Sequence, residues 1–354
     1  MEKKIINEIY WVRAIACLAV VVIHSVNITL TNYEHTVSQF EEYFLIAVRF
    51  AAFFGTPAFV FISELLLARS YPNKVPHGFF LKRVKYLLFP FVFMGLVFAF
   101  ITTDSLTGFI RESLFNVFLG GYTGYFILII FQFYILHVFL HKFLKNWSPV
   151  KVILVSLIIN VVYLSFFNFT EPLAIPLGEY IWQRGHWLPF VGWIFYFVLG
   201  YYCGKNYESL KELVIKYKKI IILFPMINLI IMFVLVRSDI LPVVSSKRID
   251  NLFYTSSVIG AIILFSLYVK KVPHFILLIS KYSFNIYLLH TFFLFYLPPI
   301  DFLNPLVYFI FAVAFSMFCS YTVAKLASPF QITQFLIGKP IPIPKHTKTQ
   351  NNRG

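Results

Sequence analysis

The chain has 354 residues, of which 59% are hydrophobic and only 13% are charged. A soluble domain is about half apolar and about a quarter charged. A fold with so little charge could not cover its own surface in water, which excludes soluble enzymes, disordered chains and nucleic-acid readers. We therefore predict an all-α protein that crosses a membrane many times.

Ten apolar runs are long enough to cross a bilayer, which takes about 20 mostly apolar residues. The first follows a charged start but is too long for the apolar core of a signal peptide, so we interpret it as a membrane anchor. A proline-rich turn at Pro298-Pro299-Ile300-Asp301 separates the last two runs. In chain order the runs lie at about 10–30, 44–66, 86–103, 122–141, 150–168, 187–204, 218–236, 251–269, 283–299 and 304–324.

Ten spans place both termini on one side of the membrane. If that side is the cytoplasm, 24 of the 30 Lys and Arg residues lie on the inner side, as the positive-inside rule requires. We therefore predict a multi-pass protein of the plasma membrane with both termini in the cytoplasm. This orientation also accounts for the net charge of +15 without a nucleic-acid partner. Residues 1–338 form one membrane domain in this interpretation, and residues 339–354 a short disordered cytoplasmic tail.

The first span contains two ionisable residues, Arg13 and His24. Eleven residues correspond to three turns plus about 20°, so both side chains share a helix face and lie about 16 Å apart. Ionisable residues inside a membrane span indicate function. The alternative is that Arg13 reaches back to the inner surface and His24 is a packing group.

Charged residues also mark the second span and the segment after it. Arg49 and Glu64 lie about 22 Å apart on a straight helix, so each needs a partner on another span. Lys82, Arg83 and Lys85 follow, and three cations within four residues suit a phosphate-bearing ligand. An ordinary positive-inside cluster would look the same.

The ninth span contains Ser283, Tyr287 and His290 at positions i, i+4 and i+7, which form one helical stripe. A polar stripe on a helix otherwise rich in Phe and Leu faces either the bundle interior or a water-filled cavity. The alternative is a seam of hydrogen bonds between helices.

The sequence predicts no metal site. Its cysteines, Cys17, Cys203 and Cys319, stand far apart inside apolar runs and are interpreted as small buried thiols. We also find no serine nucleophile elbow and no glycine-rich phosphate loop.

Several of these segments together resemble the acyltransferase 3 family of integral membrane acyltransferases, which acylate hydroxyls of cell-envelope glycans. The basic residue and histidine of the first span and the S-x-x-x-Y-x-x-H stripe of the ninth carry the likeness. Residues 49–63, 83–90 and 192–200 extend it over almost the whole chain, and residues 83–86 and 192–197 resemble the intercellular adhesion protein C branch from biofilm poly-N-acetylglucosamine operons. The chain departs from the family at three places, which hold Glu64 in place of Gly, Tyr86 in place of a second Arg, and Tyr125 in place of Trp.

The resemblance implies an acyl-coenzyme A donor on the cytosolic side and, as acceptor, an envelope or exported polysaccharide. The acyl group would be acetyl or succinyl, which the sequence leaves open. A polysaccharide synthase complex would be a further partner, and no oligomeric state is implied. His24 would act as general base for the acceptor hydroxyl, or alternatively would carry the acyl group as an acyl-imidazole. The stripe residues Ser283, Tyr287 and His290 would orient the thioester or donate to the oxyanion.

The remaining site residues follow from the same likeness. The phosphates of the donor would be bound by the cations at the inner face, namely Arg13, Lys82, Arg83 and Lys85. Arg49 and Glu64 would be structural supports within the membrane.

Two other classes stay open. An exporter or flippase for a polysaccharide or lipid-linked sugar would also have about ten helices with buried Arg, Glu and His, although no inverted repeat is visible. A catalytically inactive member of a synthase complex is the third possibility. A requirement for coenzyme A would separate the enzyme from the exporter, and the effect of His24→Ala would separate the enzyme from the inactive partner.

Overall fold

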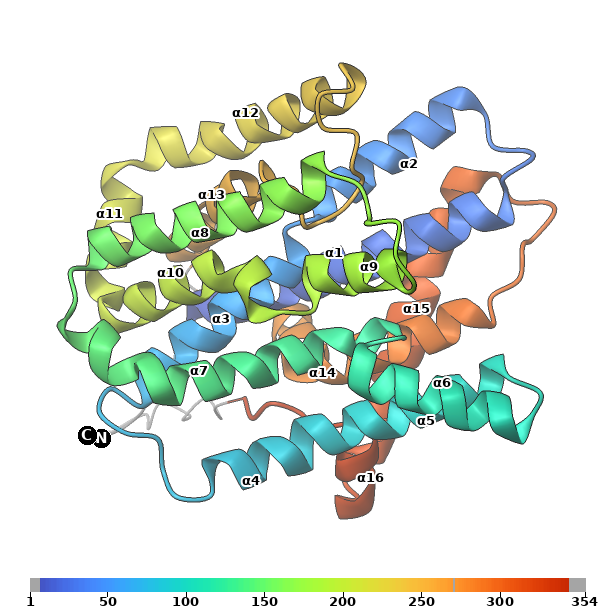
Figure 1. The fold of residues 1–354 in the computed structure, drawn as a ribbon, viewed down its shortest axis with the longest axis horizontal. Helices are drawn as coiled ribbons and strands as arrows, with labels where there is room; N and C mark the ends of the chain where they lie inside the picture. The colour runs from blue at the N-terminus through green and yellow to red at the C-terminus, as the bar shows by residue number, and fades with distance from the viewer. Residues whose placement is uncertain (1–6, 270, 344–354) are drawn as a thin grey trace, which may run out of the picture.

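The computed structural model describes residues 7–269 and 271–343. Over these residues the chain is helical and contains no strand. Ten helical segments are long and apolar enough to cross a membrane, so the predicted all-α, ten-span architecture is confirmed. The segments lie side by side in one bundle (Figure 1).

Six of the spans are single unbroken helices, of which the first and ninth matter most for the site. Pro273 precedes the ninth helix, which begins nine residues before the predicted start because the apolar pattern already runs from Phe275 to Ile279. The predicted proline-rich turn does separate the last two helices. The six are α1 (Asn7–Asn32), α8 (Pro149–Phe169), α12 (Lys218–Arg237), α13 (Asn251–Tyr268), α14 (His274–Phe295) and α15 (Pro305–Ala327).

Three spans are each built from two helices with a short break between them. The predicted apolar runs leave residues 104–121 and 169–186 between spans, but the structure forms a helix within each of these segments, α6 and α9. The sequence did not predict these two helices because their apolar content is only moderate. The glycines at 120 and 121 follow α6 and are ordinary helix stops. The pairs are α2 (Gln39–Ala52) with α3 (Gly55–Ser70), α6 (Leu106–Leu119) with α7 (Phe126–Asn146), and α9 (Gly178–Trp187) with α10 (Ile194–Lys205).

Side chains from neighbouring helices satisfy backbone groups at these breaks. Asn251 Nδ2 donates to the carbonyl of Phe53 at 3.3 Å, and Asn160 Nδ2 donates to the carbonyl of Gly192 at 3.0 Å. Tyr287 donates its hydroxyl to the carbonyl of Thr123 at 2.6 Å. Irregular backbone at membrane depth is tolerated only where protein or an internal cavity surrounds it, so all three breaks belong to the interior of the bundle.

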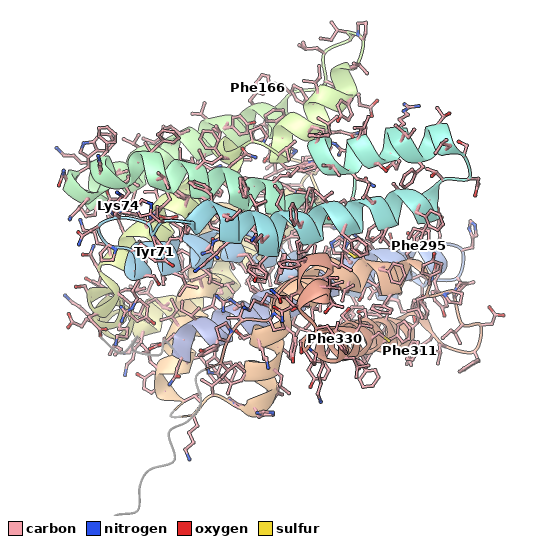
Figure 2. All side chains as sticks on the ribbon, turned by 90° about the horizontal axis from the view of Figure 1, so that it is seen from below. Tyr71, Lys74, Phe166, Phe295, Phe311 and Phe330 are labelled. Carbon is pink, nitrogen blue, oxygen red and sulfur yellow. The ribbon has the colours of Figure 1, made fainter. Side chains whose placement is uncertain are left out.

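The third span changes its winding near its start. A five-residue helix α4 (Phe79–Arg83) leads into a π-helical turn η1 (Val84–Leu88), and α5 (Phe89–Thr102) completes the span. Pro90 lacks an N–H and cannot donate to the carbonyl four residues earlier, which favours the wider turn. The turn lies at the end of the bundle where α3 ends and α4 begins, near Tyr71 and Lys74 (Figure 2).

Two short helices and the chain end complete the fold. They are α11 (Tyr207–Lys216) and α16 (Gln331–Leu336), and α16 packs against η1 and α5. The residues after α16 run along α14, where the amide of Ile341 donates to the carbonyl of Lys281 at 2.9 Å. Of the tail predicted at 339–354, residues 344–354 lie outside the described residues.

Large apolar side chains cover much of the outer surface. Phe166, Phe295 and Phe311 are among them and project from the bundle in Figure 2. Water would not tolerate so much exposed apolar surface, whereas lipid does. The chain is therefore a multi-pass membrane protein.

Glycines allow three helices in the centre of the bundle to approach closely. A Cβ atom at Gly200 would lie 2.5 Å from the carbonyl oxygen of Phe61, and one at Gly204 would lie 2.3 Å from that of Leu65. Gly55 of α3 approaches Ala16 of α1 in a similar way. Small residues spaced four apart are a common device for packing membrane helices, and here they fix α3 between α1 and α10.

Candidate active site

Helices α1 and α14 run side by side in the same direction. The thiol of Cys17 donates to the carbonyl of Ser283 at 3.7 Å, and seven residues further along both helices the rings of His24 and His290 are 5.1 Å apart. Equal steps on both helices mean that they stay in register over two turns. The structure thus brings together the histidines of the first and ninth spans, which are 266 residues apart in sequence.

The protonation of His290 follows from its surroundings. The side chain is fully buried, and its Nδ1 lies 2.9 Å from the carbonyl oxygens of Ile286 and Tyr287. Carbonyl oxygens only accept, so Nδ1 carries the hydrogen. Nε2 then holds a lone pair, and it has no hydrogen-bond partner among the described residues. His290 therefore presents a basic nitrogen in the membrane interior.

His24 is only partly buried and forms no hydrogen bond with a described residue. The nearby ammonium group of Lys247 acts electrostatically on it. Lys247 donates to the hydroxyl of Tyr125 at 3.2 Å, and the Tyr125 and Trp187 rings are 4.0 Å apart. Lys247, with the two rings around it, could not be predicted from the sequence, because it comes from a loop and the rings come from two broken spans whose pairing no local pattern reveals.

The other two stripe residues of α14, Ser283 and Tyr287, also form hydrogen bonds. The hydroxyl of Ser283 donates to the carbonyl of Ser280 at 3.0 Å, which leaves its oxygen able to accept. The ring of Tyr287 is 6.3 Å from that of His290, and its hydroxyl is held by Thr123. The side chain of Thr123 in turn meets that of Thr291 at 2.8 Å. Part of the stripe is therefore a hydrogen-bonded seam, the alternative considered from the sequence.

A cavity of about 690 Å³ lies next to this stripe. Volumes of 300 to 1,000 Å³ are typical of small-molecule sites. Ser283 and Tyr287 line it at the histidine side. Four cations line it as well, and no carboxylate appears among its described lining residues; these cations are Arg13, Lys82, Arg83 and Lys339.

Arg83 is held in place without a counterion. Its guanidinium carbon lies 4.9 Å from the ring centroids of both Phe79 and Tyr134. Its Nε is buried without a hydrogen-bond partner, and no ion pair between described residues involves it. A partly buried arginine with an unused donor is suited to bind an anion. Lys85, by contrast, is exposed and does not line the cavity.

The two intramembrane residues of the second span each find a partner on another span, as expected. Arg49 donates to Asn27 Oδ1 of α1 at 3.1 Å. Glu64 Oε1 lies 2.5 Å from His137 Nδ1 of α7. Neither residue lines the cavity.

The described residues contain no group of three His, Cys, Asp or Glu side chains that could hold a metal ion. The three cysteines are free; Cys17 is buried, whereas Cys203 and Cys319 are only partly buried.

Acyl transfer needs a base, and this polytopic membrane protein holds a histidine pair near a cation-lined cavity. Residues 6–325 match the family model described as an acyltransferase domain, and the chain belongs to that acyltransferase family. By family and fold it is therefore a membrane acyltransferase.

Named relatives extend this assignment. The chain is 39% identical over 308 residues to the "Putative membrane-bound acyltransferase YfiQ" of Bacillus subtilis, covering 82% of this chain and 81% of the relative. It is 32% identical over 351 residues to the "Probable poly-beta-1,6-N-acetyl-D-glucosamine export protein" of Staphylococcus aureus, covering 95% and 97%. The protein of the same name from Staphylococcus epidermidis is 29% identical over 348 residues, covering 94% of each chain. No solved structure matches the chain.

Proposed function

We propose that the protein transfers an acetyl or succinyl group from acyl-coenzyme A to a hydroxyl of a cell-envelope or exported polysaccharide. The observation that carries the proposal is the position of the His24–His290 pair. It lies one helical turn beyond Tyr287 at one side of a cavity that also holds four cations without carboxylate partners among the described residues.

The cations are the reason to propose coenzyme A as the carrier of the acyl group. Coenzyme A carries several phosphates, and Arg13, Lys82 and Arg83 offer charge-assisted hydrogen bonds to such groups. The apolar part of the cavity, which includes Phe59 and Ile130, suits the uncharged arm that ends in the thioester. The thioester would then lie near Ser283 and Tyr287, with the histidines just beyond.

The reaction needs one proton transfer at each stage. His24 accepts the proton of the acceptor hydroxyl as its oxygen attacks the thioester carbon. The C–S bond then breaks, and the proton passes from the imidazolium to the departing thiolate, which gives the ester and free coenzyme A. The lone pair on His290 Nε2 can accept a hydrogen bond from the neighbouring His24 and so orient it, as a second group orients a catalytic histidine elsewhere.

The proposed orientation places the cation-lined side of the cavity in the cytoplasm and His24 toward the outer side. It rests on the 24 Lys and Arg residues assigned to the inner side. Both termini are then cytoplasmic, and the membrane is the plasma membrane. A donor made in the cytosol and an acceptor outside would meet at the histidine pair, and a polysaccharide synthase complex is the partner we propose to supply that acceptor.

Export of a polysaccharide is the second candidate function, because the staphylococcal relatives are named as export proteins. Acyl transfer and export make opposite predictions for a strain without the protein. Loss of an acyltransferase removes ester groups from polymer that still reaches the surface. Loss of an exporter leaves the polymer inside the cell.

The test compares three strains of the source organism by mass spectrometry of the surface polysaccharide. They are wild type, a deletion, and a deletion that expresses His24→Ala at equal membrane abundance. We expect ester-linked acyl groups to vanish in both mutants while polymer remains at the surface. Unchanged acylation with polymer retained inside would overturn the proposal and support the exporter.

A further inference from the structure

The segment that follows α16 forms one wall of the cavity. Its four consecutive residues from Lys339 to Pro342 line the cavity. This segment, residues 337–342, is called the strap below. The family match ends at residue 325, so the strap lies outside the part of the chain that the family model covers.

Specific contacts hold the strap on α14. Asn285 Nδ2 donates to the carbonyls of Ile337 and Gly338, both at 2.8 Å, and the amide of Ile341 donates to the carbonyl of Lys281 at 2.9 Å. Gly338 has a positive φ of 92°, which a glycine adopts without strain. A Cβ atom at this position would lie 2.4 Å from the ring of Phe284. The close approach to α14 therefore requires glycine.

These contacts place Lys339 beside the cationic side of the cavity. Its ammonium group lies 5.1 Å from the centroid of the Tyr86 ring, which stacks on Phe335 of α16 at 5.5 Å. Tyr86 also lines the cavity, one turn beyond Lys82 and Arg83. Lys339 pairs with no carboxylate of the described chain, so its charge is available to a ligand.

We propose that the strap is part of the donor site and that Lys339 binds a phosphate of the nucleotide thioester together with Lys82 and Arg83. This inference rests on the proposed function, because it assigns the same cavity to the same donor. The ligand class is a polyanionic nucleotide. The family resemblance would place a second arginine at the position of Tyr86. The strap instead places the ammonium group of Lys339 over the Tyr86 ring.

The experiment measures binding of coenzyme A to the full-length protein in lipid nanodiscs by titration calorimetry at several salt concentrations. In Lys339→Ala we expect the Kd to rise about tenfold, the effect of losing one charge-assisted hydrogen bond. The dependence of the Kd on salt should weaken as well, because fewer charges contact the ligand. Lys339→Arg should keep most of the affinity.

A matched control is available on α15. Lys325 lies over the Tyr321 ring at 5.6 Å, much as Lys339 lies over Tyr86, but it does not line the cavity. Lys325→Ala should leave both the Kd and its salt dependence unchanged. An equal loss in both variants would mean that general surface charge, and not the strap, attracts the ligand, and would overturn the inference.

A second variant tests the strap without removing the lysine. Gly338→Ala introduces a Cβ where the backbone and Phe284 leave no room, so it should displace the strap and weaken binding as much as Lys339→Ala does. Hydrogen exchange of the Ile341 amide reports whether the strap has left α14. A displaced strap with unchanged affinity would overturn the inference.

The outcomes separate this inference from the proposed function. If the wild-type protein binds coenzyme A and Lys339→Ala binds it equally well, the strap assignment is wrong and the donor stands. If the wild-type protein does not bind coenzyme A, the proposed donor is wrong and the assignment of Lys339 falls with it.

Discussion

Glu64 Oε1 lies 2.5 Å from Nδ1 of His137, and the two side chains are only 2% and 1% exposed. Glu64 Oε2 has no hydrogen-bond partner among the described residues. The pair joins α3 to α7, and neither residue lines the cavity. Each side chain gives the other its one hydrogen-bond partner within the described chain, so we interpret the pair as a structural link between two spans.

Removing one partner should therefore destabilise the protein. Glu64→Ala leaves His137 buried without a partner, at a cost of about 1–3 kcal/mol. Glu64→Gln should cost less, because its amide oxygen can still accept from Nδ1. The unfolding temperature in nanodiscs, followed by tryptophan fluorescence, tests this prediction. It should be highest for the wild type, lower for Glu64→Gln and lowest for Glu64→Ala.

The double variant Glu64→Leu/His137→Leu separates structure from chemistry. Replacing a buried polar pair by apolar residues of similar volume is often nearly neutral for stability. We expect the double variant to fold and to retain acyl transfer. A folded double variant without activity would show that the pair takes part in catalysis.

A second prediction concerns the buried lone pair on Nε2 of His290. His290→Phe keeps an aromatic ring beside His24 but removes the nitrogen that orients it, so the transfer rate should fall by about tenfold, the effect of one lost hydrogen bond. The KM for the donor should hardly change, since His290 does not line the cavity. Single-turnover rates and coenzyme A binding, measured on the same preparation, distinguish this from misfolding.

The role of His24 as base or as acyl carrier can be decided without the acceptor. A carrier would become labelled when the protein is incubated with radiolabelled acyl-coenzyme A alone, and hydroxylamine would release the label. As a general base His24 forms no covalent bond, so we expect no labelled protein. Label that is present in the wild type and absent in His24→Ala would establish the carrier mechanism.

Several features of the molecule could be predicted from the sequence, because they depend on local composition. The number of spans follows from apolar length, and the placement of Arg13 and His24 on one face follows from helical periodicity. Helical periodicity also predicts the stripe of Ser283, Tyr287 and His290. Only the structure shows that this stripe lies against the first span. The helical register between α1 and α14 has no signature in either segment alone.

Other features could not be predicted, because they arise from contacts between distant segments. Lys247 comes near His24 only through the folding of a loop, and His137 meets Glu64 across 73 residues. Lys339 was assigned to a disordered tail, since proline-rich polar composition carries no information about a docking surface. Lys82, Arg83 and Lys85 looked equivalent in sequence, but the helix turns Lys85 away from the cavity.

That difference between neighbouring cations is itself testable. Arg83→Ala should raise the KM for acyl-coenzyme A at least tenfold, because a guanidinium held between two aromatic rings loses little freedom on binding a phosphate. Lys85→Ala should change the KM less than twofold. Equal effects of the two substitutions would show that the cluster acts only through its summed charge.

The contact between α3 and α10 predicts how glycine substitutions affect stability. Gly204→Ala places a methyl group 2.3 Å from the carbonyl oxygen of Leu65, so the helices must separate. Such overpacking costs about 1–3 kcal/mol. Gly260→Ala is the matched control, since its Cβ would meet only Ile221 at 3.6 Å. Unfolding temperatures should fall for Gly204→Ala and stay near wild type, or rise slightly, for Gly260→Ala.

The orientation of the whole bundle can be measured with single cysteines on a background that lacks Cys17, Cys203 and Cys319. Lys74 lies between α3 and α4 and Glu171 between α8 and α9, and both are exposed. If the cation-lined side of the cavity faces the cytoplasm, a membrane-impermeant maleimide on intact cells should label Glu171→Cys and not Lys74→Cys.

Inverted membrane vesicles should reverse that pattern, which controls for accessibility. Because Lys74 lies in the loop after α3, near Tyr71 of the cavity wall, its side of the membrane is also the side from which a phosphate-bearing donor must enter. Labelling of Lys74→Cys from outside would place the cations away from the cytosolic pool of acyl-coenzyme A. The proposed donor would then be untenable, whatever the histidines do.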